Sequence, residues 1–240
     1  MVTLRKLPKG ANCAALAGKI RRRRFLLFRS LAAPLARPYT ILDVGGTREF
    51  WETVGFTGED GVSIVLLNIT LRTSRHASFR SVVGDARCLG FPDNAFEVVF
   101  SNSVIEHVGD FEQQRQMANE VQRVGRRYFL QTPNRFFPFE PHFLFPFFQF
   151  LPFRLRVFLI RHFAMGHFGR VRDRRRAEGI VRSIRLLSER ELQKLFPDGE
   201  IYRERFLGLT KSFVVYGGWD SGQPKAAHRK LTREPLTSVP

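Results

Sequence analysis

The chain has 240 residues, a formal net charge of +17 and 43% hydrophobic residues, among them 25 phenylalanines. This length suits one domain with appendages, or two small domains, and is enough to bury a real core. Cys13 and Cys88 are the only cysteines, and neither belongs to a CxxC or Cys/His pattern. The sequence therefore shows no disulfide framework, and we expect no metal site.

The first 37 residues form a basic segment, with ten Lys or Arg residues and no acid. We expect residues 1–37 to be an arm outside the folded domain that attracts anionic partners, either nucleic acid, anionic lipid or phosphorylated glycans. A solvated basic surface without a partner is the alternative. The apolar stretch after the Arg run at 21–24 is too short for a secretory signal. The expected location is the cytoplasm, with peripheral binding to the inner face of the membrane.

From residue 40 onward, short apolar runs alternate with segments long enough for helices. The expected strands are 40–44, 62–70, 79–85, 96–100, 126–132, 200–207 and 211–218. Helices are expected at 48–55, 110–124 and 188–196. Asp110 is the expected N-cap of the second helix, and Ser188 forms a capping box with Glu191 in the third. This order favours an α/β domain over 38–219 with a parallel sheet covered on both faces, followed by a disordered tail at 220–240.

A Phe-rich segment, 135–187, follows the fifth expected strand as an insertion. Prolines and charged residues interrupt its apolar part, so it is not a transmembrane helix. We expect a mostly helical cap. The cap either completes the core, covers an apolar pocket as a lid, or lies on a membrane surface together with the second basic cluster at 170–176.

Polar residues follow each of the first five expected strands. In an open α/β sheet, ligands bind outside the carboxyl ends of the strands, so these residues are candidates for one site. They are Asp43, Gly45 and Gly46, then Asn68, then Asp85 and Ala86, then Ser101 to His107, and finally Thr132 to Asn134. Glycines allow a ligand to approach the backbone closely. Asn68 can bond ribose hydroxyls, Asp85 can accept from an adenine amino group, and Ala86 leaves an N–H free, which together describe an adenosine site.

Three stretches carry a family resemblance: ILDVGGT, GDARCLGFPDNAFEVVFSNSVIEHV and QTPNRFFPFEPH. The chain resembles class I S-adenosylmethionine-dependent methyltransferases of the small-molecule, type 11-like group, strongly over residues 39–134. The resemblance implies a Rossmann-like, doubly wound, seven-stranded sheet with an antiparallel last strand, and S-adenosylmethionine as cofactor. It also implies cofactor contacts, which are Asp43, Gly45 and Gly46 at the methionine and ribose part, Asn68 at the ribose, Asp85 and Ala86 at the adenine, and Ser101 in the pocket.

The sequence departs from this family in two places. Thr47 and Glu49 occupy the later positions of the usual G-x-G-x-G loop, and Asn68 replaces the usual ribose-binding acid. Both changes support an alternative, a degenerate binder of S-adenosylmethionine without catalysis. A nicotinamide-binding protein is disfavoured, because no G-x-G-x-x-G follows the first strand.

Methyl transfer needs an aligned acceptor and, for a hydroxyl acceptor, a base. His107 is the first candidate for the base, Glu106 could orient it or bind the acceptor, and His142 is the second candidate if the cap folds over the site. The acceptor is unidentified. The basic arm and the cap favour a glycan or a lipid-linked precursor at a membrane surface. An RNA methyltransferase is the competing class, and nucleic acid is the less favoured partner because the aromatic residues are not interleaved with the basic runs.

Overall fold

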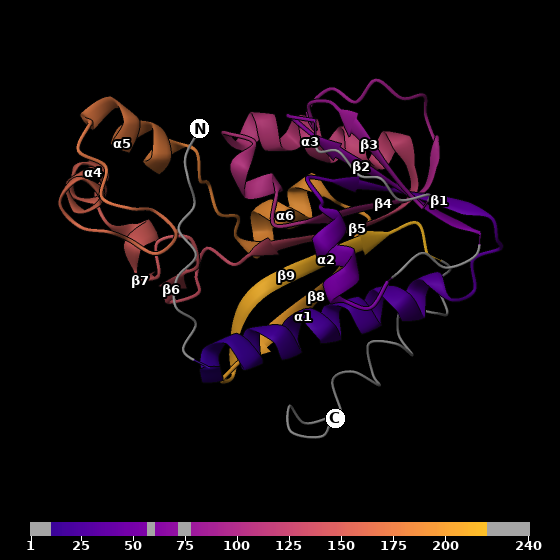
Figure 1. Ribbon diagram of the computed structural model, residues 1–240, viewed down its shortest axis with the longest axis horizontal. Coiled ribbons are helices and arrows are strands. Elements are labelled where there is room, and N and C mark those ends of the chain that lie inside the picture. The colour runs from indigo at the N-terminus through magenta and orange to yellow at the C-terminus, as the bar shows by residue number, and fades with distance from the viewer. Residues whose placement is uncertain (1–10, 57–60, 72–77, 220–240) are drawn as a thin grey trace.

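The computed structural model describes residues 11–56, 61–71 and 78–219, with side chains from residue 18 onward. Its centre is a seven-stranded sheet in the order β3-β2-β1-β4-β5-β9-β8 (Figure 1). The strands are β1 (Tyr39–Val44), β2 (Val62–Asn68), β3 (Phe79–Val83), β4 (Phe96–Asn102), β5 (Gly125–Pro133), β8 (Glu200–Phe206) and β9 (Leu209–Gly217). Strands β1 to β5 are parallel, whereas the last strand, β9, runs antiparallel to both β5 and β8. The expected α/β fold and its antiparallel last strand are thus confirmed.

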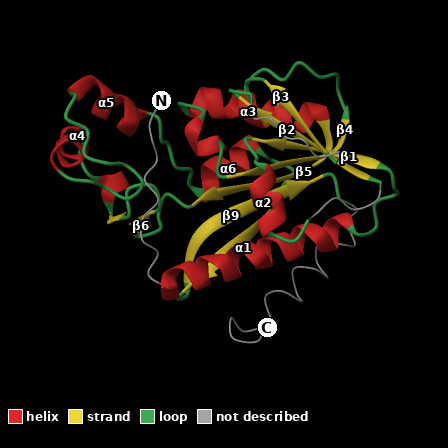
Figure 2. Cartoon of the chain, viewed as in Figure 1, coloured by secondary structure: helices red, strands yellow, loops and turns green. Residues whose placement is uncertain are grey.

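Helices cover both faces of this sheet, as Figure 2 shows. On one face, α3 (Phe111–Val124) and α6 (Glu189–Leu195) pack over a core that includes Leu42, Val99 and Leu130. On the other face, α1 (Ala11–Ala32) and α2 (Arg48–Thr53) bury an aromatic cluster. Burial of both sheet faces explains why the central strands read as continuous apolar runs instead of alternating ones.

The two predicted helix N-caps, Asp110 and Ser188, are confirmed. The Asp110 side chain accepts a hydrogen bond from the Gln113 backbone N–H, and the Gln113 side chain returns one to Asp110, which completes a capping box. Ser188 and Glu191 form a second capping box at the start of α6. Between β3 and β4, where no helix was predicted, residues 84–95 form turns.

The described part of the basic N-terminal segment is not an arm, and this corrects the expected domain boundary at residue 38. Helix α1 lies along one face of the sheet and crosses β8 and β9 in Figure 1. Its apolar residues Leu27, Phe28 and Leu31 are buried, and the Phe28 ring packs edge-on against Phe100 and Phe129 of the central strands. The helix therefore belongs to the domain core.

One arginine of α1 is buried with its partners. Arg24 is 9% exposed and makes two hydrogen bonds to the carboxylate of Glu204 on β8, through Nε at 2.8 Å and through Nη2 at 2.6 Å. Its Nη1 also donates to Gln131 at 3.1 Å and to Asn102. Glu204 in turn accepts from the Ser212 hydroxyl at 2.6 Å. The Arg24 side chain therefore connects α1 to the sheet and is part of the structure of the domain.

The inserted segment forms the expected cap, and it has a hydrophobic cluster of its own. It contains β6 (Phe139–Glu140), β7 (Phe145–Pro146), the 3-10 turn η2 (Phe148–Phe150), α4 (Phe153–His162) and α5 (Arg174–Arg182). Ile160, Ala177 and Phe148 are central to the buried cluster of the cap. Six other phenylalanines of this segment are between 45% and 63% exposed: Phe136, Phe139, Phe147, Phe150, Phe158 and Phe163.

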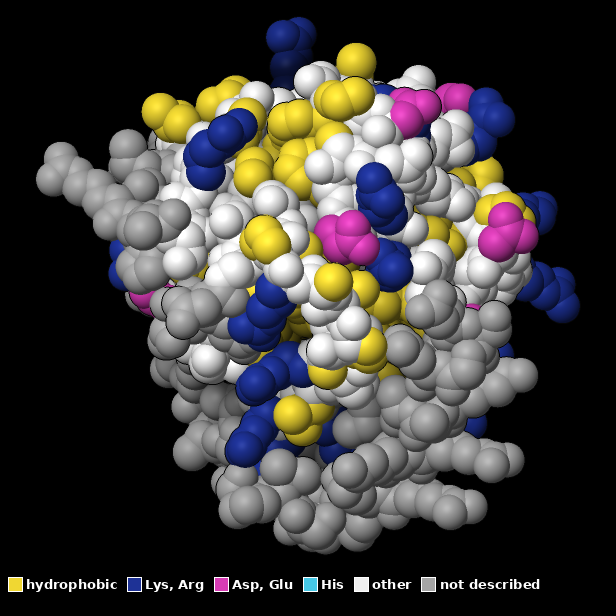
Figure 3. All heavy atoms as spheres, turned by 90° about the vertical axis from the view of Figure 1, so that its right-hand side faces the viewer, with side chains coloured by type: hydrophobic (Ala, Val, Ile, Leu, Met, Phe, Trp, Pro, Cys, Tyr) yellow, Lys and Arg dark blue, Asp and Glu magenta, His cyan; other side chains and the backbone are white. Residues whose placement is uncertain are grey.

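Basic side chains are not confined to the N-terminal segment. Figure 3 shows the end of the molecule opposite the cap, where Lys and Arg side chains lie among apolar ones and few acids are visible. None of the described helices is both long enough and apolar enough to cross a membrane. The tail predicted to be disordered, 220–240, lies outside the described residues.

Candidate functional site

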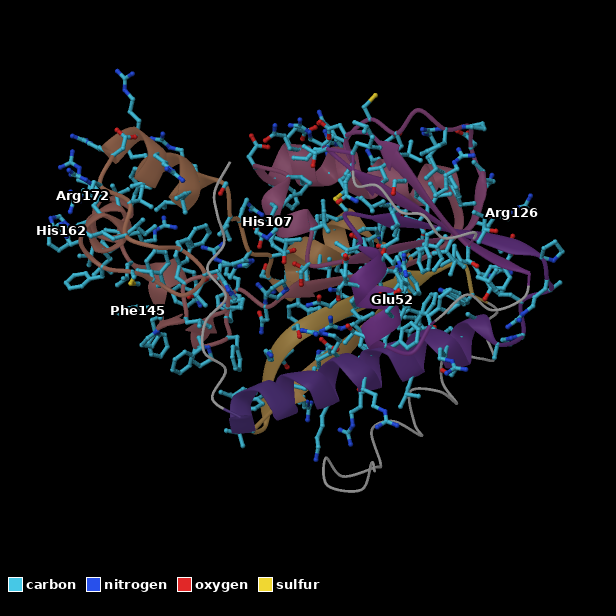
Figure 4. The ribbon with its side chains drawn as sticks, viewed as in Figure 1. Glu52, His107, Arg126, Phe145, His162 and Arg172 are labelled. Carbon is cyan, nitrogen blue, oxygen red and sulfur yellow. The ribbon has the colours of Figure 1, made fainter. Side chains whose placement is uncertain are left out.

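A pocket of about 460 Å³ opens at the carboxyl ends of the parallel strands. It brings together four of the predicted cofactor residues and one of the predicted catalytic residues, which are Gly45, Asn68, Asp85, Ala86 and His107. Figure 4 shows His107 at the end of the sheet that faces the cap and Arg126 at the opposite end. The size of the pocket lies within the range of about 300–1,000 Å³ that is usual for small-molecule sites.

The glycine loop after β1 is short because α2 begins immediately behind it. Gly45 has a φ of +77°, and a Cβ at this position would lie 2.5 Å from Val104, so the loop requires glycine here. Thr47 is the N-cap of α2 and accepts from the Phe50 N–H, and Glu49 lies in the first helical turn. The later positions of the usual glycine motif therefore belong to a helix in this chain.

Asn68 connects the end of β2 to this loop. Its Nδ2 donates to the Gly46 carbonyl at 2.9 Å, a hydrogen bond that a carboxylate could not make. The substitution of the usual acid thus has a structural reason. Asn68 still lines the pocket, as the adenosine prediction requires.

Asp85 lies in the pocket wall but is already engaged by a neighbour. Its carboxylate accepts from the Arg87 backbone N–H at 2.9 Å and forms an ion pair with the Arg87 guanidinium at 2.5 Å. These hydrogen bonds lower the pKa of Asp85 below its usual value. An adenine amino group would therefore meet an ionised acceptor, in competition with Arg87. Ala86 beside it is 7% exposed and also lines the pocket.

Three predicted cofactor residues, Asp43, Gly46 and Ser101, are not among the residues that line the pocket. Asp43 is 1% exposed, and its Oδ2 accepts from the Trp51 indole N–H at 2.6 Å, while Oδ1 has no hydrogen-bond partner in the described structure. Burial raises the pKa of Asp43 to about 7. A Cβ at Gly46 would overlap this carboxylate, so Gly46 is needed for packing behind the loop. Ser101 is buried and donates to the Val44 carbonyl at 3.2 Å.

The three predicted catalytic residues form one cluster between the sheet and the cap. The Nε2 atoms of His107 and His142 are 3.1 Å apart, although the residues are 35 positions apart in the chain. Glu106 is fully buried beside them, and its Oε2 accepts from the Thr132 hydroxyl at 3.1 Å. One potential metal-ligating atom from each of Glu106, His107 and His142 lies within 4.8 Å of the other two. The sequence did not indicate this group of potential metal ligands, because His142 is distant from the other two residues in the chain. The expectation of no metal site stays a prediction.

Glu140 of the cap holds the second histidine in place. Its Oε1 is 2.6 Å from Nδ1 of His142, and its Oε2 accepts from the backbone N–H groups of His142 and Phe143 at 2.8 Å and 2.7 Å. Sequence reasoning did not select Glu140. The sequence feature that could have identified Glu140 is its position two residues before His142. From there a carboxylate can accept hydrogen bonds from the backbone N–H groups of the turn that follows it.

The protonation of this cluster follows from its surroundings. Burial raises the pKa of Glu106 to about 7. Withdrawal from water and, to a smaller extent, the charge of the adjacent His142 lower the pKa of His107 to about 4. The imidazole of His107 is therefore neutral at pH 7. Burial alone would lower the pKa of His142, but hydrogen bonding to Glu140 and the charges of Glu140 and Glu106 raise it overall.

The fold and the pocket agree with the resemblance seen in the sequence. The sheet has seven strands, with β9 antiparallel between β5 and β8, and a pocket lies at the carboxyl ends of β1 to β4. This is the arrangement that the resemblance to class I S-adenosylmethionine-dependent methyltransferases implies. Residues 55–128 match the family model described as a methyltransferase domain. Residues 55–128 are thus similar to a methyltransferase domain, and the fold around them is the one expected for that class.

Two solved structures are similar to this chain at low sequence identity, and the first of them supports the fold. Magnesium protoporphyrin IX methyltransferase from Synechocystis PCC 6803, solved with bound SAH, aligns with a TM-score of 0.52 at 10% identity, covering 88% of each chain. A SAM-dependent methyltransferase from Aquifex aeolicus aligns with a TM-score of 0.46 at 12% identity, covering 80% of this chain and 87% of that one. No curated protein matches the sequence.

Proposed function

We propose that this protein transfers the methyl group of S-adenosylmethionine to an acceptor bound between the sheet and the cap. The observation that carries the proposal is the pocket that joins Gly45, Asn68, Asp85 and Ala86 to His107. The pocket fits the cofactor because it offers a close backbone approach at the glycine loop, polar groups for the ribose and an ionised acceptor for the adenine amino group.

Transfer requires little of the protein beyond alignment and exclusion of water. When bound, S-adenosylmethionine supplies an activated methyl group, whose bond to sulfur breaks with the electron pair remaining on sulfur while the acceptor atom bonds to the methyl carbon. The neutral imidazole of His107 lies in the pocket wall and accepts the proton of a hydroxyl acceptor. His142 and Glu140 hold that imidazole in position from the cap side.

The surface composition of the cap favours an acceptor that is anionic or lipid-linked and is presented at a membrane surface. The cap exposes phenylalanines and also arginines, such as Arg154, Arg172 and Arg176. Apolar rings that enter the interface and cations that contact anionic headgroups are the two contributions to binding of a peripheral protein. An RNA acceptor would use the arginines but would gain nothing from so many exposed apolar rings beside them.

Binding of the demethylated cofactor tests the proposal directly. We expect S-adenosylhomocysteine to raise the melting temperature of the wild type, since it binds only the folded state. Asp85→Asn removes the charged acceptor and should weaken binding about 10-fold or more, the usual scale for a hydrogen bond to a charged group. Asp93→Asn is the matched control, because Asp93 is an exposed acid of the same segment that pairs with Arg123. Calorimetry with S-adenosylmethionine and with S-adenosylhomocysteine gives the dissociation constant of each compound for the wild type and the variants.

The outcomes of that experiment separate the alternatives. If neither S-adenosylmethionine nor its product binds at millimolar concentration, the methyltransferase proposal is overturned. If both bind, but the labelled methyl group is never transferred to a total extract of membrane lipids and glycans or to RNA, the chain is the degenerate binder.

Membrane association is tested on the cap. The double variant Phe158→Ser/Phe163→Ser removes two rings that are 50% and 54% exposed, which should leave the fold unchanged. We expect its affinity for phosphatidylcholine vesicles containing phosphatidylglycerol to fall about 10-fold or more, since each ring contributes about 1 kcal/mol or more when buried in the interface. Leu207→Ser is the control, because Leu207 is 83% exposed in the turn between β8 and β9. Salt-sensitive binding of RNA without vesicle binding would favour an RNA acceptor instead.

A further inference from the structure

The cluster of Glu106, His107 and His142 has the composition of a metal centre. Two imidazoles and one carboxylate are the three protein ligands of many catalytic zinc sites and of some non-haem iron sites. The three side chains come from two separate parts of the chain, the turn after β4 and the cap, and one potential ligand atom from each lies within 4.8 Å of the other two.

The Glu106 carboxylate is incompletely satisfied. Glu106 is 0% exposed, and its Oε1 has no hydrogen-bond partner among the described residues. A buried carboxylate oxygen without a hydrogen-bond partner lowers the stability of the folded state. A hydrogen-bond donor or a cation is therefore expected next to it. Only the other oxygen is held, by the Thr132 hydroxyl.

The geometry of the two histidines also suits a shared cation. With Nδ1 of His142 donating to Glu140, its Nε2 presents a lone pair toward Nε2 of His107, 3.1 Å away. Two imidazole nitrogens that are each about 2.0–2.1 Å from one tetrahedral zinc ion lie about 3.3 Å from each other. A proton shared by the two rings would satisfy this contact but would leave Oε1 of Glu106 unpaired, whereas a metal ion can use all three side chains.

Glu140 supplies the support that metal-binding histidines usually have. Such a histidine almost always donates its second ring N–H to a carboxylate or a carbonyl, which fixes its tautomer and orientation. Glu140 does this for His142 at 2.6 Å, and it is itself held by two backbone N–H groups. The side chain of Glu140 is only 2% exposed, so this support is rigid.

We propose that Glu106, His107 and His142 bind one divalent transition-metal ion, with zinc the best candidate, at the junction of the pocket and the cap. His107 lies in the pocket wall, so the fourth coordination position of the ion opens toward the pocket. Magnesium, which prefers oxygen ligands, is disfavoured by two nitrogen ligands. Binding of the ion does not depend on the methyl-transfer proposal and can be measured on the protein alone.

The ion changes what His107 does. In the metal-free protein His107 accepts the proton of the acceptor, as proposed above. With an ion bound, Glu106, His107 and His142 would hold it, the Nε2 lone pair of His107 would be occupied, and the ion would supply Lewis-acid polarisation of an acceptor oxygen in its place. The ion also connects the cap to the sheet, because His142 belongs to the cap and Glu106 to the sheet side.

The test is a titration of the chelator-treated, dialysed protein with Co²⁺, followed by visible d–d absorption and by calorimetry. We expect one Co²⁺ per chain, displaced by Zn²⁺ but not by Mg²⁺. His142→Ala and Glu106→Gln should each raise the dissociation constant by about 100-fold or more, and Glu140→Gln, which acts on the orientation of His142, by about 10–100-fold. His162→Ala is the matched control, since His162 is an exposed histidine elsewhere on the cap.

Each variant is checked for its fold by its melting curve. If His142→Ala does not fold, His142→Gln keeps a polar side chain and gives the same readout. The proposal is overturned if no saturable one-to-one Co²⁺ spectrum develops, or if binding is unchanged in the double variant His107→Ala/His142→Ala. Site-specific Co²⁺ binding in a protein that fails to bind S-adenosylhomocysteine would sustain the metal site and remove the methyltransferase proposal.

Discussion

Replacing Arg24 with alanine is expected to lower the free energy of unfolding by about 3–5 kcal/mol, because the variant leaves the buried carboxylate of Glu204 without its cation. Glu204 is 4% exposed, and its remaining side-chain hydrogen bond comes from the Ser212 hydroxyl, while Lys211 is the cation that still acts on it through space. Chemical denaturation with urea, monitored by tryptophan fluorescence, gives the difference. A loss of this size would leave little of the stability of an ordinary domain.

Two further variants show whether the buried pair is the cause. Arg21→Ala removes an exposed arginine of the same helix and should change stability by no more than about 0.5 kcal/mol. The double variant Arg24→Met/Glu204→Leu removes both charges and should recover most of the loss, since apolar replacement of a buried ion pair is often neutral or stabilising. A single variant Arg24→Ala as stable as the wild type would show that α1 is held by its apolar face alone.

Replacing His107 with alanine is expected to lower single-turnover methyl transfer by about 100-fold or more, whether this imidazole accepts the proton or holds an ion. The affinity for S-adenosylhomocysteine should change much less, because Asn68, Asp85 and Ala86 provide the predicted contacts to the adenosine. The measurement uses labelled S-adenosylmethionine and any acceptor that the wild type methylates in a membrane lipid and glycan extract.

The control for this variant is His162→Ala, which should keep the wild-type rate. Melting curves recorded on the same preparations separate loss of chemistry from loss of fold. A stable His107→Ala protein that binds the cofactor product and transfers methyl groups at the wild-type rate would exclude His107 from the reaction and leave His142 as the candidate.

The strands and helix starts could be predicted because their signals are local. Runs such as VSIVLL are apolar enough to be buried on both sides, and Asp110 and Ser188 satisfy the first N–H groups of the helices that follow them. Helix α1 was missed because its buried stripe contains a charge. Ile20, Leu27, Phe28 and Leu31 are spaced as one helix face, but Arg24 occupies a position in that face and lies within a run of four arginines. Its partner is on β8, which no local pattern reveals.

The site was predictable to the extent that it follows the ends of strands. Gly45, Asn68, Asp85 and Ala86 meet in one pocket because parallel strands end at one edge of the sheet. The engagement of Asp85 by Arg87 and the burial of Asp43 behind the loop depend on side-chain packing that spacing does not determine. The contact between His107 and His142 depends on how the cap folds back, so the sequence could only name both residues as candidates.

The link between Arg24 and Glu204 also has a consequence for the order in which the chain folds. The two residues are 180 positions apart, so α1 cannot make this contact during synthesis until β8 has left the ribosome. At about 5–20 residues per second, that interval lasts about 10–40 s, during which the apolar face of α1 has no completed sheet to cover. During this interval the nascent chain carries a Phe- and Leu-containing helix with a run of four arginines, whose contacts with the sheet are still incomplete. This is the kind of segment that chaperones bind, and slowing synthesis beyond residue 32 should increase aggregation of the nascent chain.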